Sequence, residues 1–81
     1  MWSQPVVFVH EKRGLQSIKS SFEALQILDS WWTKVDGAAY KNAIIVCVSA
    51  MQGERTHEDA RAAFISALIE GDIDLAPVEK S

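Results

Sequence analysis

The 81-residue sequence contains little cysteine, proline or glycine: one cysteine, two prolines and four glycines. A lone cysteine excludes an intramolecular disulfide framework and a cysteine-rich metal site, and it is typical of a reducing compartment. Proline is too rare, and the hydrophobic fraction of 48% too high, for a disordered chain. Since a domain usually takes ~100 to 200 residues, we expect a single domain over residues 1–81.

Long hydrophobic runs are also absent. The longest run, residues 43–48, has six apolar residues, whereas a membrane helix needs ~18. The run at residues 6–9 has four, follows no basic segment and ends in the polar residues 10–13, so it does not resemble a secretory signal. We therefore expect a cytoplasmic protein without membrane contact.

Positive charge is in the minority, with 8 Lys and Arg against 11 Asp and Glu and a net charge of -3. Residues 1–36 carry four charges of each sign, whereas residues 37–81 carry four basic and seven acidic residues. Nucleic-acid binding depends on a clustered basic face, so a nucleic-acid partner is not expected. The only basic cluster is Lys12 and Arg13 with Lys19, and most such hairpin tips are solvated turns.

The start of the chain predicts a β-hairpin. Residues 5–10 are rich in β-branched and aromatic side chains, residues 15–19 alternate apolar and polar, and Gly14 is a suitable turn residue between them. Val7 and Val9 share the second face of the first strand, which a partner could cover.

Capping signals predict where two helices start. Ser20 and Glu23 fit a capping box, and the helix that follows is expected to reach about Thr33. Its apolar stripe consists of Phe22, Leu25, Leu28 and Trp32. Thr56, with acidic residues after it, opens the last helix, for which Gly71 is the expected C′ residue. The stripe of that helix consists of Ala60, Ala63, Phe64, Ala67 and Leu68.

Residues 38–51 are ambiguous, because the β-branched run at 44–48 is also typical of a buried strand. The length of the segment between Gly37 and Gly53 favours a mostly buried helix. Its helically spaced residues are Tyr40, Ala43, Ile44, Cys47, Ala50 and Met51. Residues 73–78 are expected to be extended, and the sequence leaves open whether they add an edge strand to the hairpin.

Several of these patterns recur together in one known family. They are the strand at residues 6–9, the turn ending in Gly14, Ser20-x-x-Glu23-Ala24-x-x-x-Leu28 leading to Trp31 or Trp32, Tyr40-x-x-Ala43-x-x-x-Cys47, and Ala60-Arg61-x-Ala63-Phe64-x-x-Ala67. Over nearly its whole length the chain resembles the small family, largely from rhizobial and related alphaproteobacteria, catalogued as domain of unknown function 982. The resemblance implies a helix at 38–51, and it implies no activity and no catalytic residue. The adjacent tryptophans depart from the single one expected there, so either could be the core residue.

The candidate ligand site combines Arg61, His57 and Trp31. A guanidinium at the margin of an apolar stripe can bind a carboxylate or phosphate bidentately. The structural alternative is an Arg61 side chain paired with Glu58, three residues earlier on the helix. The sequence has no motif for a metal site, and no cofactor or catalytic residue is expected. Cys47 lies in an apolar segment that disfavours a thiolate.

The candidate interface consists of apolar residues that one small core would not hide. They are Trp32, Ile65, Ile69, Val7 and Val9. The two isoleucines lie off the stripe of the last helix, and exposed tryptophan is enriched at interfaces. A domain of this size buries only about 60 to 65% of its unfolded surface, so a partner chain would add needed burial.

The fold class expected is α+β, with an N-terminal β-hairpin packed against three α-helices. The leading functional hypothesis is a non-enzymatic interaction or regulatory module that forms a homo-oligomer, such as a homodimer, or docks on another protein. The alternative is a protein or enzyme that binds a small anionic ligand in a pocket near Arg61, His57 and Trp31 or Trp32.

Overall fold

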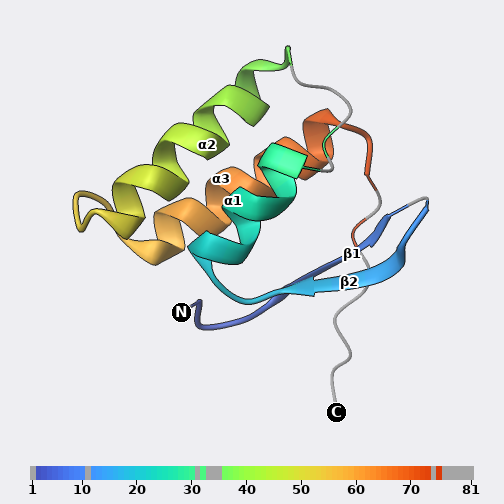
Figure 1. The fold of residues 1–81 in the computed structure, drawn as a ribbon, viewed down its shortest axis with the longest axis horizontal. Coiled ribbons are helices and arrows are strands. Elements are labelled where there is room, and N and C mark those ends of the chain that lie inside the picture. Colours follow the sequence, from blue (N-terminus) through green and yellow to red (C-terminus); the bar gives the residue numbers. More distant parts are fainter. Residues whose placement is uncertain (1, 11, 31, 33–35, 74, 76–81) are drawn as a thin grey trace.

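The computed structural model of the protein describes residues 2–10, 12–30, 32, 36–73 and 75. Over these residues the chain has an α+β fold, in which an antiparallel hairpin is followed by three helices (Figure 1). The elements are β1 (Val6–His10), β2 (Gly14–Ile18), α1 (Ser21–Ser30), α2 (Ala38–Met51) and α3 (His57–Glu70). The predicted fold class is confirmed, and so is the helix at residues 38–51.

The hairpin has the predicted turn. Val6 pairs with Ile18 and His10 pairs with Gly14, so residues 11–13 connect the strands. Gly14 has a φ of 77°, a left-handed backbone conformation that a residue without a Cβ adopts easily. Val6 and Ile18 are buried on the sheet face toward the helices.

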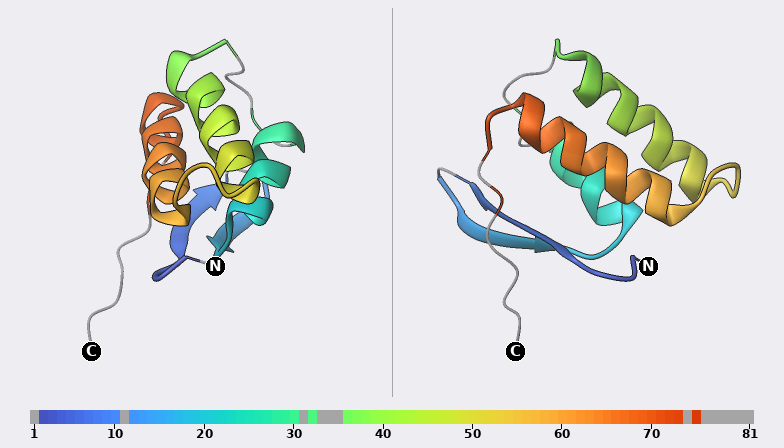
Figure 2. Two further views of the ribbon diagram at one scale, coloured as in Figure 1. Left: turned by 90° about the vertical axis from the view of Figure 1, so that its left-hand side faces the viewer. Right: turned by 180° about the vertical axis from the view of Figure 1, so that it is seen from behind.

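The helices cover one face of the hairpin. α2 and α3 pack side by side and run in opposite directions, and α1 packs against α2 (Figures 1 and 2). α1 and α3 lie closer to the strands, so α2 is the helix farthest from the sheet (Figure 2). One side of α2 is therefore covered by neither the sheet nor another helix.

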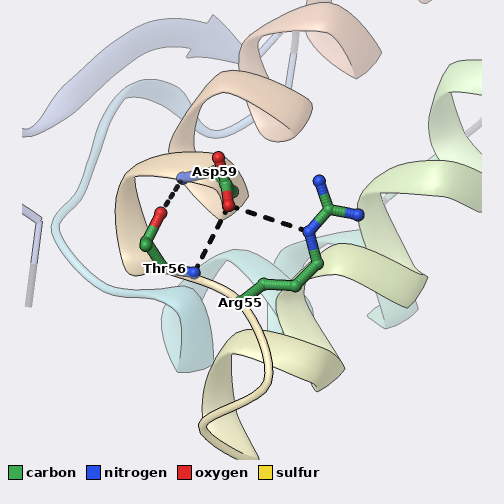
Figure 3. Close-up of polar contacts among 3 residues, drawn as sticks. All are labelled: Arg55, Thr56 and Asp59. Carbon is green, nitrogen blue, oxygen red and sulfur yellow. Dashed lines mark hydrogen bonds and ion pairs between the residues drawn. The ribbon is translucent and has the colours of Figure 1, made fainter.

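Both predicted capping residues are observed. The Oγ atom of Ser20 accepts a hydrogen bond from the Glu23 N–H at 3.2 Å, but the Glu23 carboxylate accepts from the Lys19 N–H at 2.8 Å and not from that of Ser20. At α3 the box is reciprocal: Thr56 Oγ1 accepts from the Asp59 N–H and the Asp59 carboxylate accepts from the Thr56 N–H (Figure 3). Arg55 adds an ion pair to Asp59 at 3.7 Å (Figure 3).

The end of α3 differs by one residue from the prediction. Gly71 has a φ of -80°, and the left-handed residue is Asp72, with a φ of 58°. The N–H of Ile73 donates to the Leu68 carbonyl and the N–H of Asp72 donates to the Ile69 carbonyl, which is the Schellman pattern with Asp72 at C′. Aspartate tolerates this conformation better than most residues, so the left-handed position can lie at Asp72, one residue after the C-cap Gly71.

The buried faces of the helices agree with the predicted stripes only for α3, where all five stripe residues are buried. In α1 the buried residues are Ser21, Ala24, Ile27 and Leu28, and in α2 they are Ala43, Val46, Cys47 and Ala50. Phe22 and Met51, which the stripes placed in the core, are exposed. Of the α1 stripe, Leu28 and Trp32 are buried and Leu25 packs against the core, so only Phe22 was wrong, although Trp32 lies beyond the end of α1 at Ser30.

Aromatic rings dominate the core. The ring of Phe64 lies 5.8 Å from Trp2, 5.8 Å from Trp32 and 6.0 Å from Phe8. Trp32 also stacks on Tyr40 at 6.2 Å and is buried. The expectation that Trp32 belongs to an interface is therefore corrected, since its side chain fills the core of one chain.

The predicted extended tail is seen at one residue. Leu75 forms an isolated antiparallel bridge with Phe8 of β1, on the side of β1 away from β2. The rest of that prediction, residues 74 and 76–78, lies outside the described residues, as does Trp31. None of the helices described is long and apolar enough to cross a membrane.

Candidate functional site

The first turn of α3 binds the N-terminal segment of the chain. Glu58 Oε2 accepts hydrogen bonds from the backbone N–H of Ser3 at 3.1 Å and from its hydroxyl at 2.9 Å. Arg61 donates through Nε to the carbonyl of Gln4 at 2.9 Å. The two Ser3 hydrogen bonds, and then the nearby charge of Arg61, hold the pKa of Glu58 below its usual range. The Nε atom of Arg61 is therefore already hydrogen-bonded to the N-terminal segment.

His57, on the same turn, belongs to a second contact with this segment. Its Nδ1 lies 2.8 Å from Ser21 Oγ, which accepts a hydrogen bond from the Trp2 indole at 3.2 Å. A serine hydroxyl beside an imidazole can form a nucleophile, which must also be accessible to a substrate. Ser21 is only 1% exposed, so this pair joins the N-terminal segment, α1 and α3 and has no access to a substrate in this conformation.

The structure brings together two of the three predicted ligand residues. Arg61 and His57 lie one turn apart and face the N-terminal segment, with Trp2 as their aromatic neighbour. Trp31 lies outside the described residues, and Trp32 packs in the core. Arg61 and His57 thus both have hydrogen-bond partners from the chain itself, at positions where an external anion was expected.

A carboxylate that the sequence patterns did not single out caps α2. Glu70, at the end of α3, accepts hydrogen bonds from the N–H groups of Ala39 and Tyr40, each at 3.0 Å. The N-cap residue Gly37 has no side chain to do this, and a Cβ there would collide with the Glu70 carboxylate. The signal in the sequence was a helix start with neither a capping side chain nor an acidic residue in its first turn.

The lone cysteine is not a reactive group. Cys47 is buried in α2, and desolvation raises the pKa of its thiol to about 11. A thiolate is the nucleophilic form, so this side chain is inert at neutral pH. Within the described part of the chain, no three His, Cys, Asp or Glu side chains gather as metal ligands would.

One apolar surface is shared by α1 and α2. A hollow between them is lined by Phe22, Leu25, Gln26, Asp29 and Ile44. Phe22 is 55% exposed and Ile45, next to Ile44, is 61% exposed. We call this surface the α1–α2 face and define it as Phe22, Leu25, Ile44, Ile45, Val48 and Met51. The stripes did not predict this face, because they placed Phe22 and Met51 in the core, although Leu25 and Ile44 do pack against the core cluster.

The predicted interface residues differ in exposure. Ile69 is 65% exposed and Val9 is exposed, but Val7 and Ile65 are half-buried. Ile65 packs against the core cluster, so it contributes to the fold of one chain. Of the predicted set, only Val9 and Ile69 therefore offer well-exposed apolar side chains.

These features define a small α+β domain whose polar contacts hold its own segments together and whose helices expose an apolar face. The chain belongs to the family described as Protein of unknown function (DUF982), which matches residues 4–75. Neither the curated proteins nor the solved structures contain a match to the chain.

Proposed function

We propose that the protein is a non-enzymatic cytoplasmic interaction module that self-associates through the α1–α2 face. The observation that carries this proposal is that exposed Phe22 lines a hollow between two adjacent helices with half-buried Leu25 and Ile44, and that Ile45 and Met51 of α2 are also exposed. Exposed apolar surface of this kind on a small protein commonly marks a protein interface.

The composition of α2 supports a covered position for this helix. Of its 14 residues, only Lys41, Asn42 and Ser49 are polar. A helix that is apolar nearly all round is normally buried on all sides. In this fold α1 and α3 cover part of α2, and a second chain would cover the side that carries Ile45.

A second copy suits the face because the face combines an exposed phenylalanine, Phe22, with the hollow that it lines. In a twofold dimer the same surface of both subunits forms the interface. Phe22 of each subunit can therefore enter the hollow of the other subunit. Asp29 lines the hollow, and Lys41 is exposed one turn before Ile44, so both signs of charge are available at the rim.

The expected affinity is modest. Full burial of a large apolar side chain is worth ~2 kcal/mol, so covering the exposed halves of Phe22, Ile45 and Met51 gains roughly 1 kcal/mol each, or ~6 kcal/mol for two copies. Lost translational and rotational freedom opposes this by ~4 kcal/mol or more. The remaining ~2 kcal/mol corresponds to a Kd of ~30 mM, so a dimer populated at millimolar concentration needs a further ~2 kcal/mol from the half-buried members Leu25, Ile44 and Val48.

Sedimentation velocity over a concentration series tests the proposal. The wild-type chain should shift from monomer to dimer, and Phe22→Glu or Ile45→Glu should abolish the shift without changing the circular dichroism spectrum. Ile69→Glu is the matched control, because Ile69 is equally exposed but lies on α3. A wild-type chain that stays monomeric at millimolar concentration, or a dimer lost only with Ile69→Glu, would contradict the proposal.

A further inference from the structure

The outer edge of β2 is open in the part of the chain that the structure describes. β1 has β2 on one side and Leu75, through its bridge to Phe8, on the other. At Phe8, β1 therefore has a partner on both sides, whereas β2 has a strand neighbour on one side only. Every second residue of such a strand directs its N–H and C=O groups away from its neighbour, where another strand can pair with them.

β2 lacks the features that usually protect an edge strand. Charged residues, proline and bulges within an edge strand normally prevent pairing, but residues 14–18 contain no charge and no proline. The register with β1 runs without a bulge from the Val6–Ile18 pair to the His10–Gly14 pair. Leu15 is 67% exposed opposite Val9, so an added strand would also find apolar side chains to pack against.

The charges at the two ends of β2 determine which strand fits. Lys12 and Arg13 precede the strand, Lys19 follows it, and all three are exposed. Residues 6–19 carry three basic residues and one acidic residue, although the whole chain has a net charge of -3. An antiparallel β2 from a second copy would place Arg13 opposite Lys19 at both ends, and like charges directly opposite one another destabilise a strand pair.

We propose that the β2 edge binds an extended segment of another protein by strand addition, and that this segment has a neutral β-prone centre with acidic residues at both ends. Backbone hydrogen bonds to residues 14–18 hold the segment, as in other cases of strand addition. Ion pairs with Lys12, Arg13 and Lys19 select its charge. This site is separate from the α1–α2 face.

A fluorescein-labelled peptide, DEVTVTVED, tests the proposal, with KKVTVTVKK as its charge-reversed control. Fluorescence polarisation at low salt should show saturable binding of the acidic peptide alone. The double variant Lys12→Glu, Lys19→Glu should weaken that binding at least tenfold and accept the basic peptide, whereas the matched control Lys41→Glu, on α2, should change neither. Amide hydrogen exchange should slow at residues 14–18 when the acidic peptide is added. Phe22→Glu should leave binding intact, which separates this proposal from self-association.

Three results would overturn it. The first is binding of the acidic peptide that does not reach saturation at millimolar concentration. The second is binding without added protection at residues 14–18, because charge attraction would then act without strand addition. The third is tighter, salt-sensitive binding of a single-stranded oligonucleotide, which would assign Lys12, Arg13 and Lys19 to phosphate contacts.

Discussion

The Glu70 carboxylate caps a helix to which it does not belong, and its removal gives a quantitative test of the fold. In Glu70→Ala the N–H groups of Ala39 and Tyr40 each lose an acceptor at 3.0 Å. Nothing local replaces it, because α2 has no acidic residue in its first turn and Gly37 provides no capping side chain. Loss of an N-cap costs ~1 kcal/mol, and loss of a negative charge at the helix N-terminus costs up to ~1 kcal/mol more.

We therefore expect Glu70→Ala to lower the free energy of unfolding by ~2 kcal/mol, from a total of roughly 4 to 12 kcal/mol for a chain of this length. In a domain of this size that loss lowers the Tm by about 8 to 16 °C. Circular dichroism during thermal and urea unfolding measures both quantities. Glu54→Ala is the control, because Glu54 is exposed after the end of α2 and should change stability by less than ~0.5 kcal/mol.

A second substitution makes the test specific to the contact between helices. A Cβ at residue 37 would collide with the Glu70 carboxylate, so Gly37→Ser should destabilise the wild-type chain. In the Glu70→Ala background the space is open and the backbone at residue 37 is extended, so the serine can cap α2 and restore ~1 kcal/mol. The reasoning is refuted if Glu70→Ala has the same Tm as the Glu54→Ala control. It is also refuted if Gly37→Ser changes the stability by the same amount in both backgrounds.

Three further predictions concern the titratable and cationic groups. The pKa of Glu58 is lowered in the folded chain, so the stability that Glu58 contributes is present above the pKa of an unfolded glutamate, ~4.3, and is lost as the pH falls through the lower folded value. Glu58→Gln should therefore flatten the acid side of a plot of urea midpoint against pH, and an unchanged slope would contradict this. Because burial raises the pKa of Cys47 to about 11, its reaction with a disulfide reagent should be limited by opening of the fold, and a rate equal to that of a free thiol would contradict this. If a small anion binds at Arg61, phosphate or a dicarboxylate should raise the Tm in wild type and in Arg55→Ala but not in Arg61→Ala; equal shifts in all three would remove Arg61 from the anion site.

The prediction from sequence succeeded where neighbours along the chain decide the structure. The turn before Gly14 and the caps at Ser20 and Thr56 depend on residues within four positions, and all three are observed. The stripe of α3 was also correct, because its small alanines on the Phe64 side let the helix pack closely, while Ile65 and Ile69 lie off that side. α1 offered two apolar sides of similar quality, so spacing alone could not choose between Phe22 and Ala24.

The candidate site was predicted in its residues but not in its role. Arg61 and His57 lie close together as expected, yet Gln4 and Ser21 are their partners. Those partners are separated from them by 57 and 36 positions along the chain. No pattern within a helix could reveal such contacts, because they depend on how the N-terminal segment crosses the first turn of α3.

The turn residue Gly14, the capping residues Ser20 and Thr56 and the apolar spacings by themselves determined a chain that begins with a hairpin and continues in helices, since these features act through local hydrogen bonding and backbone preference. Only the tertiary structure decided which apolar side chains remain exposed on α1 and α2, and that Glu70 caps α2 across 30 positions of sequence. The physical reason is the same in both cases. Burial and long-range capping depend on which elements are neighbours in space, and local propensities carry no information about that arrangement.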